Sequence, residues 1–193
     1  MVKRVSVYCA SSTQIDTTYL LAAGELGRIL SQNCVEVVYG GGSIGSMGAL
    51  ADAVLENNGR LIGVIPKFMM DLEWGNLSVT EMMVVNSMAE RKQEFLNNVD
   101  AVIALPGGTG TLEELSEVIS LKKLGLFTKP IIIINTNGFY NYLLKFLDKM
   151  IDDNFIRPEH KRLYSVIDDV SLVLNAIKTA PEWDHNAIKL AAL

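Results

Sequence analysis

The sequence predicts an α/β fold in which a doubly wound sheet of about seven mainly parallel strands carries helices on both faces. Apolar runs of strand length alternate with helix-length stretches along the chain. Nearly all of these runs are continuous, which is typical of parallel strands covered on both faces. In such a Rossmann-like arrangement ligands bind beyond the carboxyl ends of the strands, so the loops that follow strands are where we expect a site.

The elements follow one another in a regular order. An apolar run at 5–9 precedes a helical stretch at 19–31, and a second run at 35–39 precedes a helix at 48–57. Two runs, 61–65 and 79–85, then come before a helix at 88–98. Further strand and helix pairs are expected at 101–105 with 112–124, at 131–134 with 139–152, and at 163–167 with 169–178. The seventh strand has the weakest pattern.

Length and composition indicate a single domain with a sizeable core. The chain has 193 residues, of which 49% are hydrophobic and 20% charged. We expect one α/β domain over residues 1–180 and a C-terminal tail over 181–193 that has no clear partner. The net charge of -5 argues against a nucleic-acid partner, and no apolar run is long enough to cross a membrane. The two cysteines have no paired spacing, so we expect a cytoplasmic protein.

Three expected strands run into turns of small residues that could present backbone NH groups to an anion. The turns read Cys-Ala-Ser-Ser at 9–12, Gly-Gly-Gly-Ser-Ile-Gly at 40–45 and Pro-Gly-Gly-Thr-Gly-Thr at 106–111. Glycine lets the main chain approach an oxygen closely, and the start of the next helix adds unpaired NH donors. The turn at 106–111 is the preferred phosphate site, with hydroxyl donors from Thr109 and Thr111.

Two familiar nucleotide motifs do not fit the middle turn. Its glycines formally match GxGxxG, but the next strand ends in Gly-Val-Ile-Pro at 63–66, without the acidic residue that binds a dinucleotide ribose. Gly45 is followed by Ser46 and Met47, where a P-loop requires Lys and Ser or Thr. We attribute Gly48 and Gly63 to close packing.

Some polar residues have a structural alternative that the sequence leaves open. Glu114 follows Thr111 at capping-box spacing, so capping is at least as good an interpretation of the spacing as catalysis. Glu90 has the same spacing from Ser87, and we assign it to capping. The two histidines, His160 and His185, are interpreted as exposed surface residues, and neither has metal-ligand spacing, so no metal is expected.

Arg91 is the charged residue that is hardest to explain as a solvated surface residue. On the helix at 88–98, Met88, Phe95 and Val99 mark the buried stripe, and Arg91 lies beside it. An arginine there requires an anionic partner, either a structural carboxylate or a substrate. Lys92 binds the same anion or is solvated.

Three motifs together resemble one known family. VYGGGSIGSMG at 38–48, MAERK at 88–92 and LPGGTGTLEE at 105–114 are similar to the LOG family, the cytokinin riboside 5'-monophosphate phosphoribohydrolases, formerly labelled lysine decarboxylases. The resemblance runs from residue 5 to about 168. It implies a nucleotide-binding domain that hydrolyses an adenosine-type 5'-monophosphate to free base and ribose 5-phosphate, without a cofactor, as a homodimer.

The resemblance also implies roles for particular residues. Its catalytic pair falls on Arg91 and Glu114: a carboxylate stabilises oxocarbenium character and activates water, while the arginine holds the phosphate or ribose. The substrate-binding residues that we expect are Ser11, Gly41, Gly42, Glu73, Met88, Lys92, Gly107, Gly108, Thr109, Gly110, Thr111, Leu112 and Glu113.

Two departures from the plant pattern bear on specificity. Ala89 replaces a histidine of MHxRK, and Thr109 replaces an aromatic residue of PGGxGT, so the preference between AMP and prenylated nucleotides stays open. The homodimer is supported by apolar residues that look exposed: Leu124, Leu126 and Phe127. The alternative function is a non-catalytic nucleotide or molybdenum-cofactor carrier of the same fold. A decarboxylase would need a pyridoxal phosphate lysine, and the sequence offers no recognisable setting for one.

Overall fold

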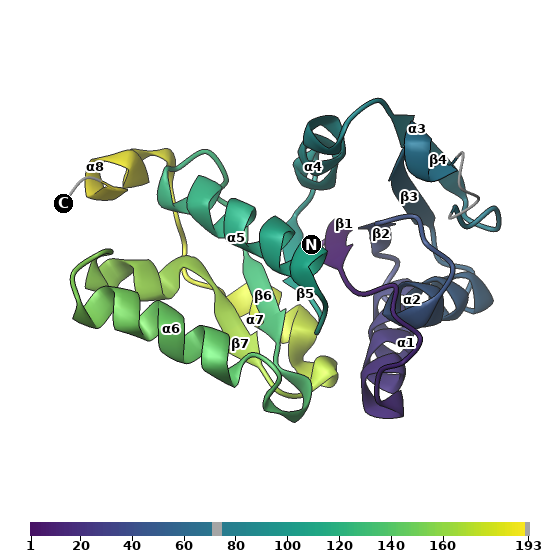
Figure 1. The fold of residues 1–193 in the computed structure, drawn as a ribbon, viewed down its shortest axis with the longest axis horizontal. Helices are drawn as coiled ribbons and strands as arrows, with labels where there is room; N and C mark the ends of the chain where they lie inside the picture. The colour runs from purple at the N-terminus through teal and green to yellow at the C-terminus, as the bar shows by residue number, and fades with distance from the viewer. Residues whose placement is uncertain (71–74, 192–193) are drawn as a thin grey trace.

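The computed structural model describes residues 1–70 and 75–191 and confirms the α/β fold (Figure 1). Seven strands form one sheet in the order β4-β3-β2-β1-β5-β6-β7, and every neighbouring pair is parallel. The strands are β1 Arg4–Tyr8, β2 Glu36–Tyr39, β3 Leu61–Pro66, β4 Glu81–Val85, β5 Ala101–Ala104, β6 Ile131–Ile134 and β7 Ser165–Ile167. The chain winds outward from β1 to β4 and then returns to place β5 beside β1. This reversal opens a crevice at the carboxyl ends of β1 and β5.

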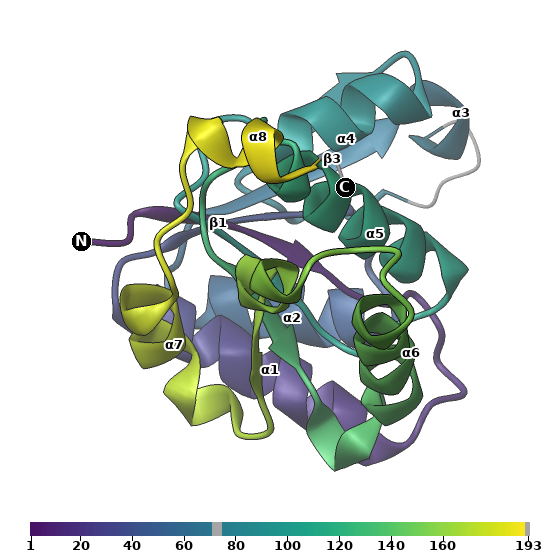
Figure 2. The same ribbon diagram turned by 90° about the vertical axis from the view of Figure 1, so that its left-hand side faces the viewer.

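Helices cover both faces of the sheet (Figures 1 and 2). Helices α1, α2 and α7 pack on one face, and α4, α5 and α6 pack on the other. The helices are α1 Thr17–Gln32, α2 Gly45–Glu56, α3 Lys67–Met70, α4 Met88–Leu96, α5 Thr109–Lys123, α6 Asn141–Asp152, α7 Val173–Thr179 and α8 Ile188–Ala191. Short 3-10 turns are η1 Thr136–Gly138, η2 Pro158–Leu163, η3 Val170–Leu172 and η4 His185–Ala187. None of the described helices is long and apolar enough to cross a membrane.

Two helices begin earlier than their apolar pattern predicts. Helix α2 begins at Gly45 instead of residue 48, and α5 begins at Thr109 instead of residue 112. In both cases the glycine-rich turn itself forms the first helical turn. These first turns consist mainly of glycine, serine and threonine, so they carry little apolar periodicity. Both helix starts lie beside the crevice, although in α2 the Met47 NH donates to the Ala10 carbonyl.

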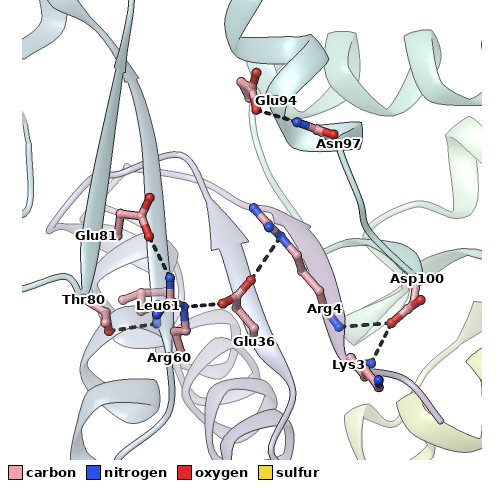
Figure 3. A network of polar contacts seen from close by, with 10 residues as sticks. All are labelled: Lys3, Arg4, Glu36, Arg60, Leu61, Thr80, Glu81, Glu94, Asn97 and Asp100. Carbon is pink, nitrogen blue, oxygen red and sulfur yellow. Dashed lines mark hydrogen bonds and ion pairs between the residues drawn. The ribbon is translucent and has the colours of Figure 1, made fainter.

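The amino ends of the strands are tied by charges instead of forming a site (Figure 3). Arg60 pairs with Glu36 and, at 2.7 Å, with Glu81, while Glu36 also lies 3.2 Å from the Arg4 Nε. Asp100 accepts hydrogen bonds from the backbone NH groups of Lys3 and Arg4. The ion pairs join strands β1 to β4 at the end of the sheet opposite the crevice.

Two residues expected at the surface are buried. Phe127 is 7% exposed and belongs to the core beneath α5, and His160 is 2% exposed. The His160 Nδ1 accepts a hydrogen bond from the Arg157 backbone NH, and its ring lies 6.2 Å from the ring of Trp183. The prediction of an exposed histidine is therefore wrong for His160, because the segments that cover it are distant in sequence.

The residues after 180 have a partner that the sequence did not indicate. The indole NH of Trp183 donates to the Lys122 carbonyl at 2.6 Å, and the His185 Nδ1 lies 2.8 Å from the Gly125 carbonyl. Ala187 is buried. The tail thus adds hydrogen bonds at the end of α5, where the Lys122 carbonyl also accepts from the Gly125 NH at 3.0 Å.

Lys122 is buried at this contact, and we expect Lys122→Met to stabilise the protein. The side chain is 1% exposed, and burial lowers its pKa to about 8. Between that pKa and its unfolded value the unfolded chain binds more protons, so stability rises with pH across this range. Methionine should therefore raise the free energy of unfolding by roughly 1 to 3 kcal/mol at pH 7. The gain should shrink as the pH rises from 8 to 10.5 in thermal unfolding, and Lys123→Met, at a partly exposed position, should show no such gain.

Candidate functional site

A cavity of about 700 Å³ lies at the carboxyl ends of β1 and β5, where the strand order reverses. Its size is that of a pocket for a small organic ligand. All three glycine-rich or serine-rich turns contribute to its wall, together with α4 and α5. The cavity therefore lies where the fold class predicted a ligand site.

The structure brings about half of the expected site residues into this cavity. Those that line it are Ser11, Gly42, Arg91, Gly108, Thr109, Gly110, Thr111 and Glu114. Other expected residues in the described part of the chain do not line it: Gly41, Met88, Lys92, Gly107, Leu112 and Glu113. Glu73 lies outside the described residues. Other lining residues were not predicted as site residues, among them Tyr8, Cys9, Met47, Met69 and Phe95.

The turn at 106–111 presents the start of α5 to the cavity. Gly108 is the N-cap, so the NH groups of the first helical turn have no partner within the helix. A Cβ atom on Gly108 or Gly110 would meet nothing within 4 Å, so packing does not require glycine at either position. The space above them is open to a ligand. Unpaired NH donors and the positive end of the helix dipole suit an anion at this place.

Glu114 does not cap this helix. Because α5 begins two residues before Thr111, Glu114 lies within the second turn, and the capping-box interpretation is wrong. Its side chain lines the cavity and is 9% exposed. By contrast, the capping assignment of Glu90 is confirmed. The Ser87 hydroxyl accepts from the Glu90 NH at 3.1 Å, and the Glu90 carboxylate accepts from the Asn86 NH at 2.7 Å.

Arg91 is held rigidly beneath the glycine-rich turn at 40–45. It is 8% exposed, and its Nε donates to the Val64 carbonyl at 3.1 Å while a terminal nitrogen donates to the Gly40 carbonyl at 3.2 Å. The guanidinium also lies 5.1 Å from the centre of the Phe95 ring. These contacts from β3, the turn and α4 leave one edge of the guanidinium facing Glu114.

The pair of Arg91 and Glu114 is the chemical centre of the cavity. The closest guanidinium nitrogen lies 3.9 Å from a Glu114 carboxylate oxygen, at the limit of an ion pair. Burial raises the pKa of Glu114 to about 7, although the positive charge of Arg91 acts in the opposite direction. A carboxyl group with a pKa near 7 can accept or donate a proton at neutral pH. Arg91 remains charged, because burial lowers its pKa from a very high value.

Lys92 pairs with two carboxylates of α5. Its ammonium lies 2.6 Å from the Glu113 carboxylate and 3.2 Å from that of Glu117. It therefore joins α4 to α5 and does not line the cavity. Among the described residues, no group of three or more His, Cys, Asp or Glu side chains could hold a metal ion.

Gly45 lies where the turn at 40–45 meets the turn at 9–12, and we expect Gly45→Ala to destabilise the protein. Its φ is +62°, and a Cβ atom there would lie 2.6 Å from the Ser11 carbonyl carbon and still closer to the Ser12 oxygen. Strain and overpacking should together cost about 2 to 4 kcal/mol in thermal unfolding. Gly110→Ala is the matched control, because a Cβ there has open space and should leave the melting temperature unchanged. Equal losses in both variants would contradict this account.

Several cavity residues that were not predicted carry apolar or weakly polar side chains from strand ends. Tyr8 ends β1, Cys9 follows it, and Phe95 lies on the buried stripe of α4. Their sequence pattern is that of core residues. Tyr8 and Phe95 do belong to the core as well as to the cavity wall, and Cys9 is partly buried against the core. One signal could have identified Tyr8 as a site residue: it is the last residue of a strand beside the point where the strand order reverses.

The comparisons with known proteins agree on one family for this chain. A family model described as "Possible lysine decarboxylase" matches residues 47–177. The cytokinin riboside 5'-monophosphate phosphoribohydrolase LOG7 of Arabidopsis thaliana is 42% identical over 189 residues, which is 97% of this chain and 87% of the relative. A rice protein of Oryza sativa subsp. japonica, named as the probable cytokinin riboside 5'-monophosphate phosphoribohydrolase LOGL9, is 47% identical over 89% of this chain and 76% of its own length.

Solved structures share the fold at much lower identity. The molybdenum cofactor carrier protein of Chlamydomonas reinhardtii superposes with a TM-score of 0.71 at 20% identity, covering 93% of this chain and 98% of that one. The molybdenum cofactor binding protein of Rippkaea orientalis gives 0.70 at 19% identity, covering 93% and 97%. Likeness at this level is evidence for the fold alone.

Proposed function

Because the chain belongs to the LOG family, whose relatives are named as phosphoribohydrolases, we propose that it hydrolyses the N-glycosidic bond of an adenosine-type nucleoside 5'-monophosphate. The products are the free base and ribose 5-phosphate, and no cofactor takes part. The observation that carries the proposal is the buried Glu114 carboxyl beside Arg91, one helical turn from the open NH groups of α5. We assign catalysis to these two side chains.

The geometry of α5 suits a ribose 5-phosphate unit. The first turn of the helix, at Thr109 to Thr111, would hold the phosphate, and Glu114 lies further along the same helix. Three to five residues along a helix correspond to a rise of about 5 to 8 Å. That is about the reach of a 5'-phosphate to the anomeric carbon of its own ribose. Binding energy at the phosphate would thus place the reacting carbon beside the carboxylate.

Glu114 then supplies the charge that the reaction requires. Cleavage of the bond between C1' and the base builds positive charge on the ribose, which a nearby carboxylate stabilises. The same carboxylate accepts the proton of the attacking water. Arg91 opposes the effect of burial on Glu114 and so keeps a useful fraction of the group ionised at neutral pH. Its guanidinium also faces the cavity, where it can bind an oxygen of the substrate.

We expect kcat/KM to rise with pH through about 7. The pKa of Glu114 in the free protein is about 7, and the ionised form is the active base, so the rate falls about tenfold per pH unit well below that value. Initial rates between pH 5 and 9 would measure this limb. The substrate phosphate titrates near pH 6. A limb centred near 6 would therefore report the substrate instead of Glu114.

Base preference is expected to depend on the apolar wall of the cavity. Ile44, Met47 and Met69 line it, and Thr109 stands where the plant pattern has an aromatic side chain. We propose that the pocket accepts AMP as well as prenylated AMP. Incubation of the purified protein with AMP, other nucleoside monophosphates and prenylated AMP, followed by chromatography, would rank the substrates. Tight binding of these nucleotides without release of any base would instead favour a carrier.

We further propose a cytoplasmic homodimer. Large apolar side chains are exposed at the end of α5 and on α6, both on the same face of the sheet: Leu124, Leu126, Tyr142 and Phe146. Aromatic and large aliphatic side chains of this kind are enriched in subunit contacts. Free thiols at Cys9 and Cys34 suit a reducing compartment. Light scattering of the purified chain at twice the monomer mass would support the dimer, and the monomer mass would exclude it.

A further inference from the structure

Tyr8 is a buried aromatic residue in the wall of the cavity that the proposed roles leave unused. It is the last residue of β1 and pairs with Ala104 of β5, so it lies at the point where the strand order reverses. Its side chain is 3% exposed, and its ring packs on Phe95 with 5.5 Å between centroids. Phe95 also contacts Arg91, which places Tyr8 in the same packed group as the catalytic pair.

The hydroxyl of Tyr8 differs from those of the two other buried tyrosines. The Tyr39 hydroxyl donates to the Gly42 carbonyl at 3.0 Å, and the Tyr140 hydroxyl donates to the Leu105 carbonyl at 2.6 Å. No hydrogen bond joins the Tyr8 hydroxyl to any other residue in 1–70 or 75–191. Tyr8 lines the cavity, whereas Tyr39 and Tyr140 do not, so its hydroxyl is open to a molecule bound there. It is therefore a group that a bound water or ligand would satisfy.

The charged side chains around Tyr8 indicate that its hydroxyl contacts a water molecule. Burial raises its pKa, and the negative charge of Glu114 acts in the same direction, so the phenol stays protonated at neutral pH. The hydroxyl can then donate one hydrogen bond and accept another. A water molecule placed between this hydroxyl and the carboxylate would have the two or more polar partners that an ordered buried water requires.

Resting on the proposed hydrolysis, we propose that the Tyr8 hydroxyl positions the attacking water against Glu114. The oxygen of this water forms the bond to C1' while the bond from C1' to the base breaks, and the electron pair of that bond leaves with the base. The proton of the water passes to the Glu114 carboxylate, and the departing base takes up a proton from Glu114 or from solvent. Tyr8 keeps its own proton throughout, so it is a positioning residue.

The test compares two conservative variants, Tyr8→Phe and Tyr140→Phe. Each removes a single hydroxyl from a buried ring. Tyr8→Phe should lower kcat about 10- to 100-fold, with KM for AMP unchanged, because only the water loses a partner. Its melting temperature should stay equal to that of the wild type or rise. Tyr140→Phe should do the reverse: the Leu105 carbonyl loses its donor, so the melting temperature falls while kcat changes little.

Each other outcome overturns a definite part of this account. An unchanged kcat in Tyr8→Phe would overturn the positioning role while leaving the proposed hydrolysis intact. A raised KM with kcat unchanged would show that the hydroxyl binds the nucleotide and not the water. A wild-type protein that releases no base would instead contradict the proposed function itself, before any variant is compared.

Discussion

Glu114→Gln should lower kcat by about 100- to 10,000-fold while the fold stays intact, because the amide can neither accept the proton of water nor stabilise positive charge on the ribose. Nucleotide binding should persist, since the turn at 106–111 and the start of α5 are unchanged. Base release measured at saturating AMP, together with nucleotide binding by calorimetry, would separate the two effects. Glu117→Gln is the matched control on the same helix, because Glu117 pairs with Lys92 outside the cavity.

The same variant should be more stable than the wild type above neutral pH. The pKa of Glu114 is raised to about 7, so the folded protein binds more protons than the unfolded chain between the unfolded pKa and 7. The stability contributed by the protonated acid is therefore present at low pH and lost as the pH rises through 7. Glutamine resembles the protonated acid and avoids this loss. The melting temperature of Glu114→Gln should exceed that of the wild type at pH 8 and match it near pH 4, and equal values at both would contradict the assigned pKa.

Arg91→Met should abolish activity and also destabilise the fold. The carbonyl groups of Val64 and Gly40 would lose their donors, and Glu114 would lose the positive charge that opposes its burial. Breaking such a buried set costs about 3 to 5 kcal/mol, and kcat/KM should fall by more than about 100-fold. Thermal unfolding and base release would measure the two losses. Arg91→Lys separates charge from geometry: it keeps the cation but cannot reach both carbonyl groups and Glu114 together.

Partial activity in Arg91→Lys, with the pH limb of kcat/KM near its wild-type position, would show that the charge beside Glu114 matters most. Activity as low as in Arg91→Met would show that the fixed orientation of the guanidinium matters most. Full activity in Arg91→Met would contradict its catalytic assignment.

The sheet and the place of the site were predictable because their signals are local. A run such as Ile131 to Ile134 is apolar on both faces of the strand, and only a strand buried on both sides requires that. Glycines in a turn between a buried strand and a helix likewise indicate a close approach of the backbone. Together these two signals predict a ligand site at the carboxyl ends of the strands.

Features that depend on contacts between distant segments could not be predicted. The start of α5 at Thr109 lies over open space, so no periodicity marks it, and Glu114 therefore matched a capping box that does not form. Lys92 has its partners on α5, 21 or more residues away, and His160 is covered by Trp183. Pairings of this kind depend on how elements pack, and spacing within one element carries no information about them.

The measurement that tests the central claim most directly is the release of adenine and ribose 5-phosphate from AMP by wild-type protein and by Glu114→Gln, purified in the same way and shown by circular dichroism to be equally folded. We expect the two products in equal amounts from the wild type and almost none from the variant. Equal release by both proteins, or none by the wild type with AMP and prenylated AMP alike, would contradict the assignment of Glu114 as the base of an N-glycosidic hydrolase.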